Sequence, residues 1–269
     1  MSHLYEHEID DPWAARAVTL PVESEAPATA ERGIRALLAV SREALSAGER
    51  DYTSGPIGRA VVLLAIPMVL EMAMEALFAI FDVFFVSRLG VDAVAAVGLT
   101  EAVMTILYAL AGGVGMAVTA LVARRIGERR PEEAAVATVQ AIALGVAVSV
   151  LVGVPGALLA GTLLGLMGAP AAVAATGSGY AAVMFGSSLT VVLLFMINAA
   201  FRGAGDAALA MRTLWLANGV NLLLDPCLIF GLGPFPEMGL VGAAWGNAIG
   251  RGVGVAYQVA VLLRGRGAL

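Results

Sequence analysis

The sequence contains few of the residue types from which catalytic and metal sites are built. It has no lysine, one cysteine (Cys227) and two histidines, and only 14% of its 269 residues are charged. A single cysteine excludes a disulfide bond within the chain. His3 and His7 lie in the charged N-terminal stretch "HLYEHE", and the sequence has neither a Walker motif nor a Cys/His cluster with metal-ligand spacing. We therefore expect no enzymatic activity, no cofactor, no structural metal and no binding to nucleic acid.

Apolar residues make up most of what is present. Hydrophobic residues account for 59% of the chain and the mean hydropathy is +0.87, whereas a soluble domain has about 25% charged residues. This composition predicts an integral membrane protein. The net charge of −5 does not indicate a binding surface, because the acidic groups are concentrated in the first 51 residues and describe a solvated tail.

Residues 1–55 are expected to form a cytoplasmic N-terminal tail. They lack the basic start, short apolar core and small-residue cleavage site of a signal peptide. The stretch "ERGIRALLAVSREAL" places Ile34, Leu37, Leu38 and Leu45 near one helical face. This pattern favours either a short amphipathic helix at the membrane surface or a loosely ordered tail.

Residues 56–269 are predicted to form an all-α bundle of six transmembrane helices. Each apolar block is long enough for the roughly 20 residues that cross a bilayer. Pro67, inside the first block, removes a backbone donor and is expected to bend or tilt that helix. The predicted spans are about 57–86, 94–123, 134–164, 171–201, 208–232 and 239–263.

The arginines predict the orientation of these spans. Because positive charge accumulates in cytoplasmic loops, the distribution puts both termini in the cytoplasm of a multi-pass protein of the inner membrane. Only Arg88 falls on the outer side. The arginines on the inner side are Arg50, Arg59, Arg124, Arg125, Arg129, Arg130, Arg202, Arg212, Arg264 and Arg266.

Ionisable residues inside the predicted spans are the strongest functional signal. A charge at the centre of a membrane helix costs about 2.5–3.5 kcal/mol, so such residues normally face a partner or a wet cavity. At about 100° per residue, Glu71, Glu75 and Asp82 share one face of the first helix. The same arithmetic places three polar residues on one face of the fifth helix. The ionisable residues are Glu71, Glu75, Asp82, Glu101, Asp225 and Arg251, and the neighbouring amides of the fifth helix are Asn218 and Asn221.

Two interpretations of these residues remain open. Asp82 and Asp225 are predicted to lie at similar depth, where two carboxylates with neighbouring amides can share a proton or hold a hard cation. Alternatively, the acids form an ion pair with Arg251, or are permanently protonated and only hold helices together.

Five stretches resemble, in order, the N-terminal half of the MATE (multidrug and toxic compound extrusion) transporters, most closely the NorM and DinF-like branches. The resemblance covers about residue 51 to the end, and the ordered series is more specific than any one motif. The stretches are "DYTSGPIGRAVVLLAIPMVLEMAMEALFAIFDVFFVSRLG", "VDAVAAVGL…GGVGMAVTALVARRIGE", "NAAFRGAGDA", "NGVNLLLDPCLIFGLG" and "GLVGAAWGNAIGR".

The resemblance implies a cation-coupled antiporter, driven by H⁺ or Na⁺, that exports amphipathic or cationic organic compounds by alternating access between two six-helix lobes. Asp82, Asn221 and Asp225 match the family's cation-site positions, and Pro67 matches the proline at which the first helix bends. Asn198 matches a fourth-helix motif. Asn247 stands where the sixth helix often has threonine, and Asn198 and Asn247 complete the expected set of cation-coupling residues. Glu71 and Glu75 depart from the family pattern and, with Glu101, are candidate contacts for a proton or a cationic substrate.

The chain has one lobe of the twelve-helix family pattern. Both lobes of the family share one orientation, related by an axis along the membrane normal, so the missing C-terminal lobe could be replaced by a second copy of this chain. A truncated gene is the simpler explanation. The alternatives from other classes are a lipid or polyprenyl-oligosaccharide flippase of the same superfamily and a membrane subunit that transports nothing.

Overall fold

The computed structural model describes residues 43–45 and 57–264. Contacts within the chain divide it into two units, Met1–Ala39 and Val40–Leu269, and everything that follows concerns the second. The predicted tail, residues 1–55, lies outside the described residues except for residues 43–45, which are helical. The prediction of an amphipathic helix in the tail therefore stays a prediction.

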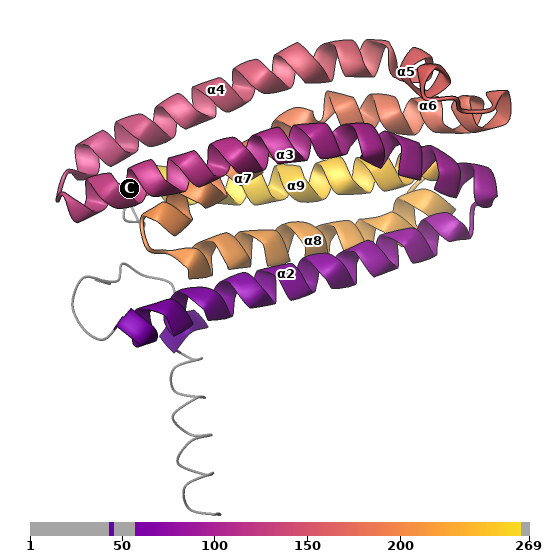
Figure 1. Ribbon diagram of the computed structural model, residues 1–269. Helices are drawn as coiled ribbons and strands as arrows, with labels where there is room; N and C mark the ends of the chain where they lie inside the picture. Colours follow the sequence, from indigo (N-terminus) through magenta and orange to yellow (C-terminus); the bar gives the residue numbers. More distant parts are fainter. Residues whose placement is uncertain (1–42, 46–56, 265–269) are drawn as a thin grey trace, which may run out of the picture. The chain divides into compact units, whose positions relative to one another are not determined.

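The described part of the chain is helical, with short turns between helices and no strand (Figure 1). Its helices are α2 (Ile57–Ser87), α3 (Val91–Gly127), α4 (Pro131–Leu158), α5 (Ala160–Leu166), α6 (Ala171–Gly186), α7 (Ser188–Gly203), α8 (Ala207–Phe230) and α9 (Leu240–Leu263).

Four predicted spans correspond to single helices: α2, α3, α8 and α9 match the first, second, fifth and sixth ranges within a few residues. The helix α2 continues through Pro67 without a break. The other two predicted spans are each interrupted. The third consists of α4 and the short α5, separated at Leu159 shortly after Pro155, and a proline removes one helical hydrogen bond. The fourth is broken at Ser187, next to Gly186, where α6 and α7 meet with a bend of 40°. Adjacent glycine and serine commonly allow such kinks.

The helices are those of an integral membrane protein. Length and apolar character mark α2, α3, α4 and α8 as candidate spans, and the bent pair α6–α7 adds a fifth. The helix α9 is not among them because Asn247, Arg251 and Gln258 lower its hydropathy. That α9 also crosses the membrane stays a prediction from its 24-residue length and its place in the bundle.

The packing of the helices positions the polar residues. The helices α8 and α9 form the most extensive pair in the described bundle, and α2 packs chiefly against α8, beside which it runs in Figure 1. On the other side, α3 and α4 pack against α7 around a core that includes Met104, Val192 and Met196. The polar face of α8 therefore lies between α2 and α9.

Candidate cation site

The fifth predicted span, α8, has clear start and stop signals. Asp206 caps its N-terminus by accepting a hydrogen bond from the Leu209 amide at 2.9 Å. At its C-terminus Gly231 adopts a left-handed conformation with φ 68°, which glycine takes without steric cost. Between these ends the helix continues through Pro226. The signals fix the helical register, and with it which side chains face the bundle interior.

Three polar residues share the buried face of α8. Asn218 is 8% exposed, Asn221 is 2% exposed and Asp225 is completely buried. Both carboxylate oxygens of Asp225 and both amide heteroatoms of Asn221 lack a hydrogen-bond partner in the described part of the chain, as does Nδ2 of Asn218. An unpartnered buried polar group costs about 1–3 kcal/mol, and more if it is charged. Groups of this kind are expected to bind something that enters from outside the chain.

Glycines of α9 form the wall opposite Asp225. A Cβ atom at Gly246 would collide with Asp225 Oδ1, and one at Gly250 would lie 2.9 Å from Asn221 Cβ. One turn earlier, a Cβ at Gly242 would collide with the Leu228 carbonyl oxygen. The spacing of four residues puts these glycines on one helical face, so α9 approaches α8 closely, as small residues permit in membrane helices. Gly246 was not among the site residues predicted from the sequence, although this four-residue spacing is visible in the sequence.

Asp82 of α2 is half-buried and lies near enough to Asp225 for their charges to interact. Glu101 of α3, also half-buried, interacts electrostatically with Asp82. Glu75 is exposed. The structure therefore places Asp82 within electrostatic range of Asp225, which shares its helix face with Asn221, and Glu101 within range of Asp82, and it leaves Glu75 on an exposed surface.

The ion pair in this region involves residues that the sequence did not connect. Glu71 is 8% exposed, and its Oε1 accepts a hydrogen bond from Arg202 Nη1 of α7 at 2.8 Å. The other oxygen of Glu71, Oε2, has no partner among the described residues. Arg251 forms no ion pair with an acid of the described residues, because none of their carboxylate oxygens lies within 4.0 Å of it. The alternative of an ion pair with Arg251 is therefore not seen in this part of the chain.

The two remaining candidates are Asn198 and Asn247. Neither is hydrogen-bonded to the side chain of Asp225 or Asn221 in the described part of the chain. Asn198 is 2% exposed, and its Oδ1 accepts a hydrogen bond from Gln258 Nε2 of α9 at 2.7 Å. Asn198 is therefore not hydrogen-bonded to Asp225. Asn247 of α9 is half-buried. Gln258, which is not among the residues predicted from the sequence, is fully buried, and its Oε1 has no hydrogen-bond partner in the described part of the chain.

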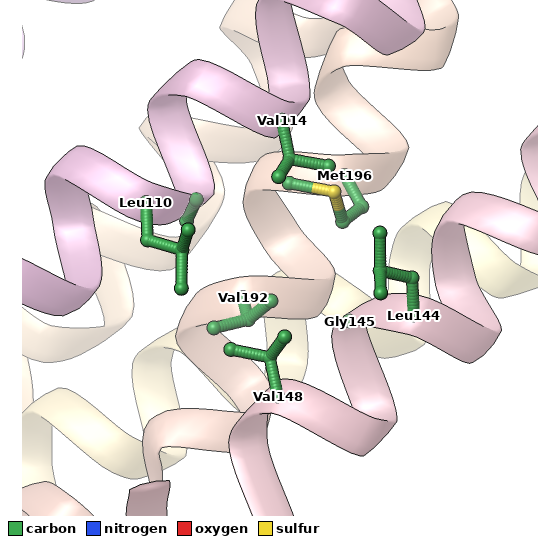
Figure 2. A pocket seen from close by; sticks show the side chains of 8 residues that line it. Leu110, Val114, Leu144, Gly145, Val148, Val192 and Met196 are labelled. Atoms are coloured by element: carbon green, nitrogen blue, oxygen red, sulfur yellow. The ribbon is translucent and has the colours of Figure 1, made fainter. Parts of the chain in front are cut away.

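An apolar pocket lies elsewhere in the bundle, between α3, α4 and α7 (Figure 2). Its lining contains no polar side chain, so it offers no ligand to an ion. The lining residues are Leu110, Ala111, Val114, Leu144, Gly145, Val148, Val192 and Met196.

The chemistry of the Asp225 group suits a proton or one monovalent cation. Carboxylate and amide oxygens are hard ligands, and two interacting carboxylates can share a proton. Among the described residues no three His, Cys, Asp or Glu side chains are grouped as a metal site would require. Asp82, Asn221 and Asp225 are thus the candidate residues for binding a proton or a cation.

The comparisons with known proteins identify the family. Residues 67–227 match the MatE family model, and the chain belongs to this family. It is 32% identical over 191 residues to the FAD transporter of Shewanella oneidensis, covering 71% of this chain and 42% of that protein. It is 26% identical over 199 residues to the multidrug export protein MepA of Staphylococcus aureus, covering 74% and 43%.

Solved structures agree with this assignment. A multidrug resistance MATE family transporter in an outward-facing conformation has a TM-score of 0.72 and 33% identity, covering 77% of this chain and 45% of that one. A transporter of the MOP superfamily from Pyrococcus furiosus has a TM-score of 0.73 and 32% identity, covering 79% and 46%. The expectations of a MATE resemblance, of an all-α membrane fold and of a protein that is not an enzyme are confirmed. The chain spans less than half the length of these relatives.

Proposed function

We propose that the chain forms one lobe of a cation-coupled antiporter that exports amphipathic or cationic organic compounds by alternating access. The observation that carries the proposal is the buried Asp225, whose carboxylate has no partner in the described bundle and lies beside the equally unpartnered Asn221. A carboxylate with only a structural role would be expected to have hydrogen-bond partners. The names of the relatives, a multidrug export protein among them, support export as the direction of transport.

In the proposed mechanism the coupling ion and the substrate compete for the same carboxylates. With Asp82 and Asp225 ionised, the group attracts a cationic substrate, and Glu101 adds to this attraction. Binding of H⁺ or Na⁺ neutralises one charge and releases the substrate. The ion that enters down its gradient thereby drives the substrate out, and the choice between H⁺ and Na⁺ requires an experiment.

A second lobe is needed for alternating access. The chain covers 42–46% of its relatives, so the opposite wall of the cavity comes either from a C-terminal lobe or from a second copy of this chain. The α2 surface near Glu75 is exposed, as are Ile80 and Val83. We propose that the second lobe faces this part of α2.

Both ends of the described bundle are proposed to lie on the cytoplasmic side of the inner membrane. Arg124, Arg125 and Arg130 gather around the turn between α3 and α4, where they pair with Glu128 and Glu133. A reporter that is active only in the cytoplasm, inserted in this turn or fused after Leu269, is expected to be active. The same reporter in the turn between α2 and α3, beside Arg88, should be silent. The reverse pattern would contradict the orientation.

Efflux from proteoliposomes tests the coupling. With the complete assembly reconstituted and a fluorescent cationic compound as the probe, an imposed gradient of the coupling ion is expected to accelerate efflux of the probe. Dissipating that gradient with an ionophore should return probe efflux to the rate measured with protein-free liposomes. Parallel measurements with a pH gradient and a Na⁺ gradient distinguish the two ions. A probe efflux that responds to neither gradient would contradict cation coupling.

A further inference from the structure

Arg251 is a charged residue that the coupling mechanism does not use. It lies near the middle of α9 (Leu240–Leu263) and is half-buried. An arginine in the middle of a membrane helix is costly to insert. Arginine stays charged under all ordinary conditions. Its position therefore calls for a compensating partner.

Tyr108 of α3 holds the guanidinium in place. Arg251 Nη1 donates a hydrogen bond to Tyr108 Oη at 3.4 Å, and the guanidinium carbon lies 5.7 Å from the centre of the Tyr108 ring. The Tyr108 ring is itself stacked on Phe195 of α7, with the ring centres 6.4 Å apart. An aromatic face attracts a cation at this distance. The pair α3–α7 thus orients the Arg251 side chain without neutralising its charge.

The hydrogen-bonding capacity of Arg251 is mostly unused. A guanidinium has five N–H donors. Within the described part of the chain Arg251 donates one hydrogen bond, to Tyr108. No carboxylate oxygen of the described residues lies within 4.0 Å. Since a carboxylate binds a guanidinium through two parallel hydrogen bonds, the free edge of Arg251 has the geometry for a carboxylate from another molecule.

Negative charges surround Arg251 at longer range. Glu75, Asp82 and Glu101 all interact with it electrostatically. The region therefore presents one fixed positive group and several acids, not a uniformly negative surface. A compound with a positive group alone is attracted by the acids but leaves Arg251 without a partner, and one with a negative group alone is repelled by the acids. A zwitterion satisfies both.

We propose that Arg251 and Tyr108 form a carboxylate-binding subsite for zwitterionic amphipathic compounds. The carboxylate of the compound binds the free edge of the guanidinium, and its cationic group faces Asp82 and Glu101. This assignment deepens the proposed export function and rests on it. Arg251 then determines specificity and is separate from the residues that bind the coupling ion.

A matched pair of dyes tests the proposal. Rhodamine 110 is a zwitterion with a free carboxylate, and rhodamine 123 is its methyl ester, a cation of nearly the same shape. Binding of each dye to the 269-residue chain in lipid nanodiscs is measured by fluorescence anisotropy. We expect rhodamine 110 to bind about tenfold more tightly, the gain expected of one charge-assisted contact.

Variants assign this preference to Arg251. The change Arg251→Gln should weaken rhodamine 110 about tenfold and leave rhodamine 123 unchanged or slightly tighter, so that the ratio falls to about one. The change Arg251→Lys should give an intermediate ratio because an ammonium lacks the two-pronged geometry, and it supplies the comparison if the glutamine variant does not fold. Arg88→Gln is the matched control, since Arg88 also lies over an aromatic ring, that of Phe84, at 4.8 Å.

Each outcome decides the proposal. The proposal is supported if the preference for rhodamine 110 over rhodamine 123 disappears in Arg251→Gln and persists in Arg88→Gln. Equal affinity of the two dyes for the wild-type chain, an equal loss for both dyes in Arg251→Gln, or the same change of ratio in Arg88→Gln would overturn it. Failure of both dyes to bind would also overturn it, whereas cation coupling is judged separately by ion-driven efflux.

Discussion

Asp225→Asn is expected to abolish ion-driven efflux while leaving the folded bundle almost unchanged. Asparagine keeps the shape of the buried side chain but can neither bind and release a proton nor supply a negative charge. Because the substitution is nearly isosteric, its cost in unfolding free energy should stay below about 1.5 kcal/mol. Efflux under an imposed pH or Na⁺ gradient, measured at matched protein levels, should fall to the rate of empty liposomes. Asp82→Asn should behave in the same way.

The controls separate a coupling role from a structural one. Asn221→Ala removes one neutral ligand and should weaken the affinity for the coupling ion less than the loss of either carboxylate. If Asp225 is a permanently protonated acid that only holds helices together, its amide is a good mimic and transport should persist. Wild-type efflux in the Asp225→Asn and Asp82→Asn variants would therefore rule out the coupling role.

Two glycine-to-alanine changes on α9 should have large and different effects. In Gly242→Ala the new methyl group meets the backbone carbonyl of Leu228, which cannot rotate away. Overpacking of this kind typically costs about 1–3 kcal/mol, so the thermal unfolding temperature in detergent should fall. In Gly246→Ala the methyl group meets the Asp225 carboxylate, which can move. This variant should lose more coupling-ion affinity than stability.

Gly98→Ala is the matched control for both variants. Gly98 is also a helix residue, in α3, and an added Cβ there would have no neighbour within 4 Å. Its ion affinity should match that of the wild type, and its unfolding temperature should match or slightly exceed the wild-type value because alanine favours a helix more than glycine does. An unchanged unfolding temperature in Gly242→Ala, or unchanged ion affinity in Gly246→Ala, would show that α8 and α9 are not packed as closely as the glycines indicate.

The features that could be predicted from the sequence depend on neighbours along the chain. The buried face of α8 is one of these, since helical periodicity alone places Asn218, Asn221 and Asp225 together. Periodicity also places Glu71, Glu75 and Asp82 on one face of α2, but it does not give their surroundings. Glu71 is buried and Glu75 exposed, because burial depends on which other helices pack against α2.

Features that depend on contacts between distant segments were missed. The position of Arg202 at the end of a span predicted only a cytoplasmic turn, because its ion pair with Glu71 joins residues 131 positions apart. The contact of Arg251 with Tyr108 spans 143 positions. The break at Ser187 was missed for a different reason, since hydropathy does not distinguish one straight span from two shorter helices that meet at an angle.

The Glu71–Arg202 pair gives α2 an uneven electric profile along its axis. The helix carries no acidic residue before Glu71. Its Arg59 is paired with Glu43, and Arg202 balances the charge of Glu71 itself. The acids of α2 without a paired arginine, Glu75 and Asp82, therefore both lie in its C-terminal half. A cation moving beside this helix from its N-terminal end would cross an electrically neutral stretch and then meet a region of negative potential. The attraction for cations is thus concentrated near the end of α2 that leads into Arg88.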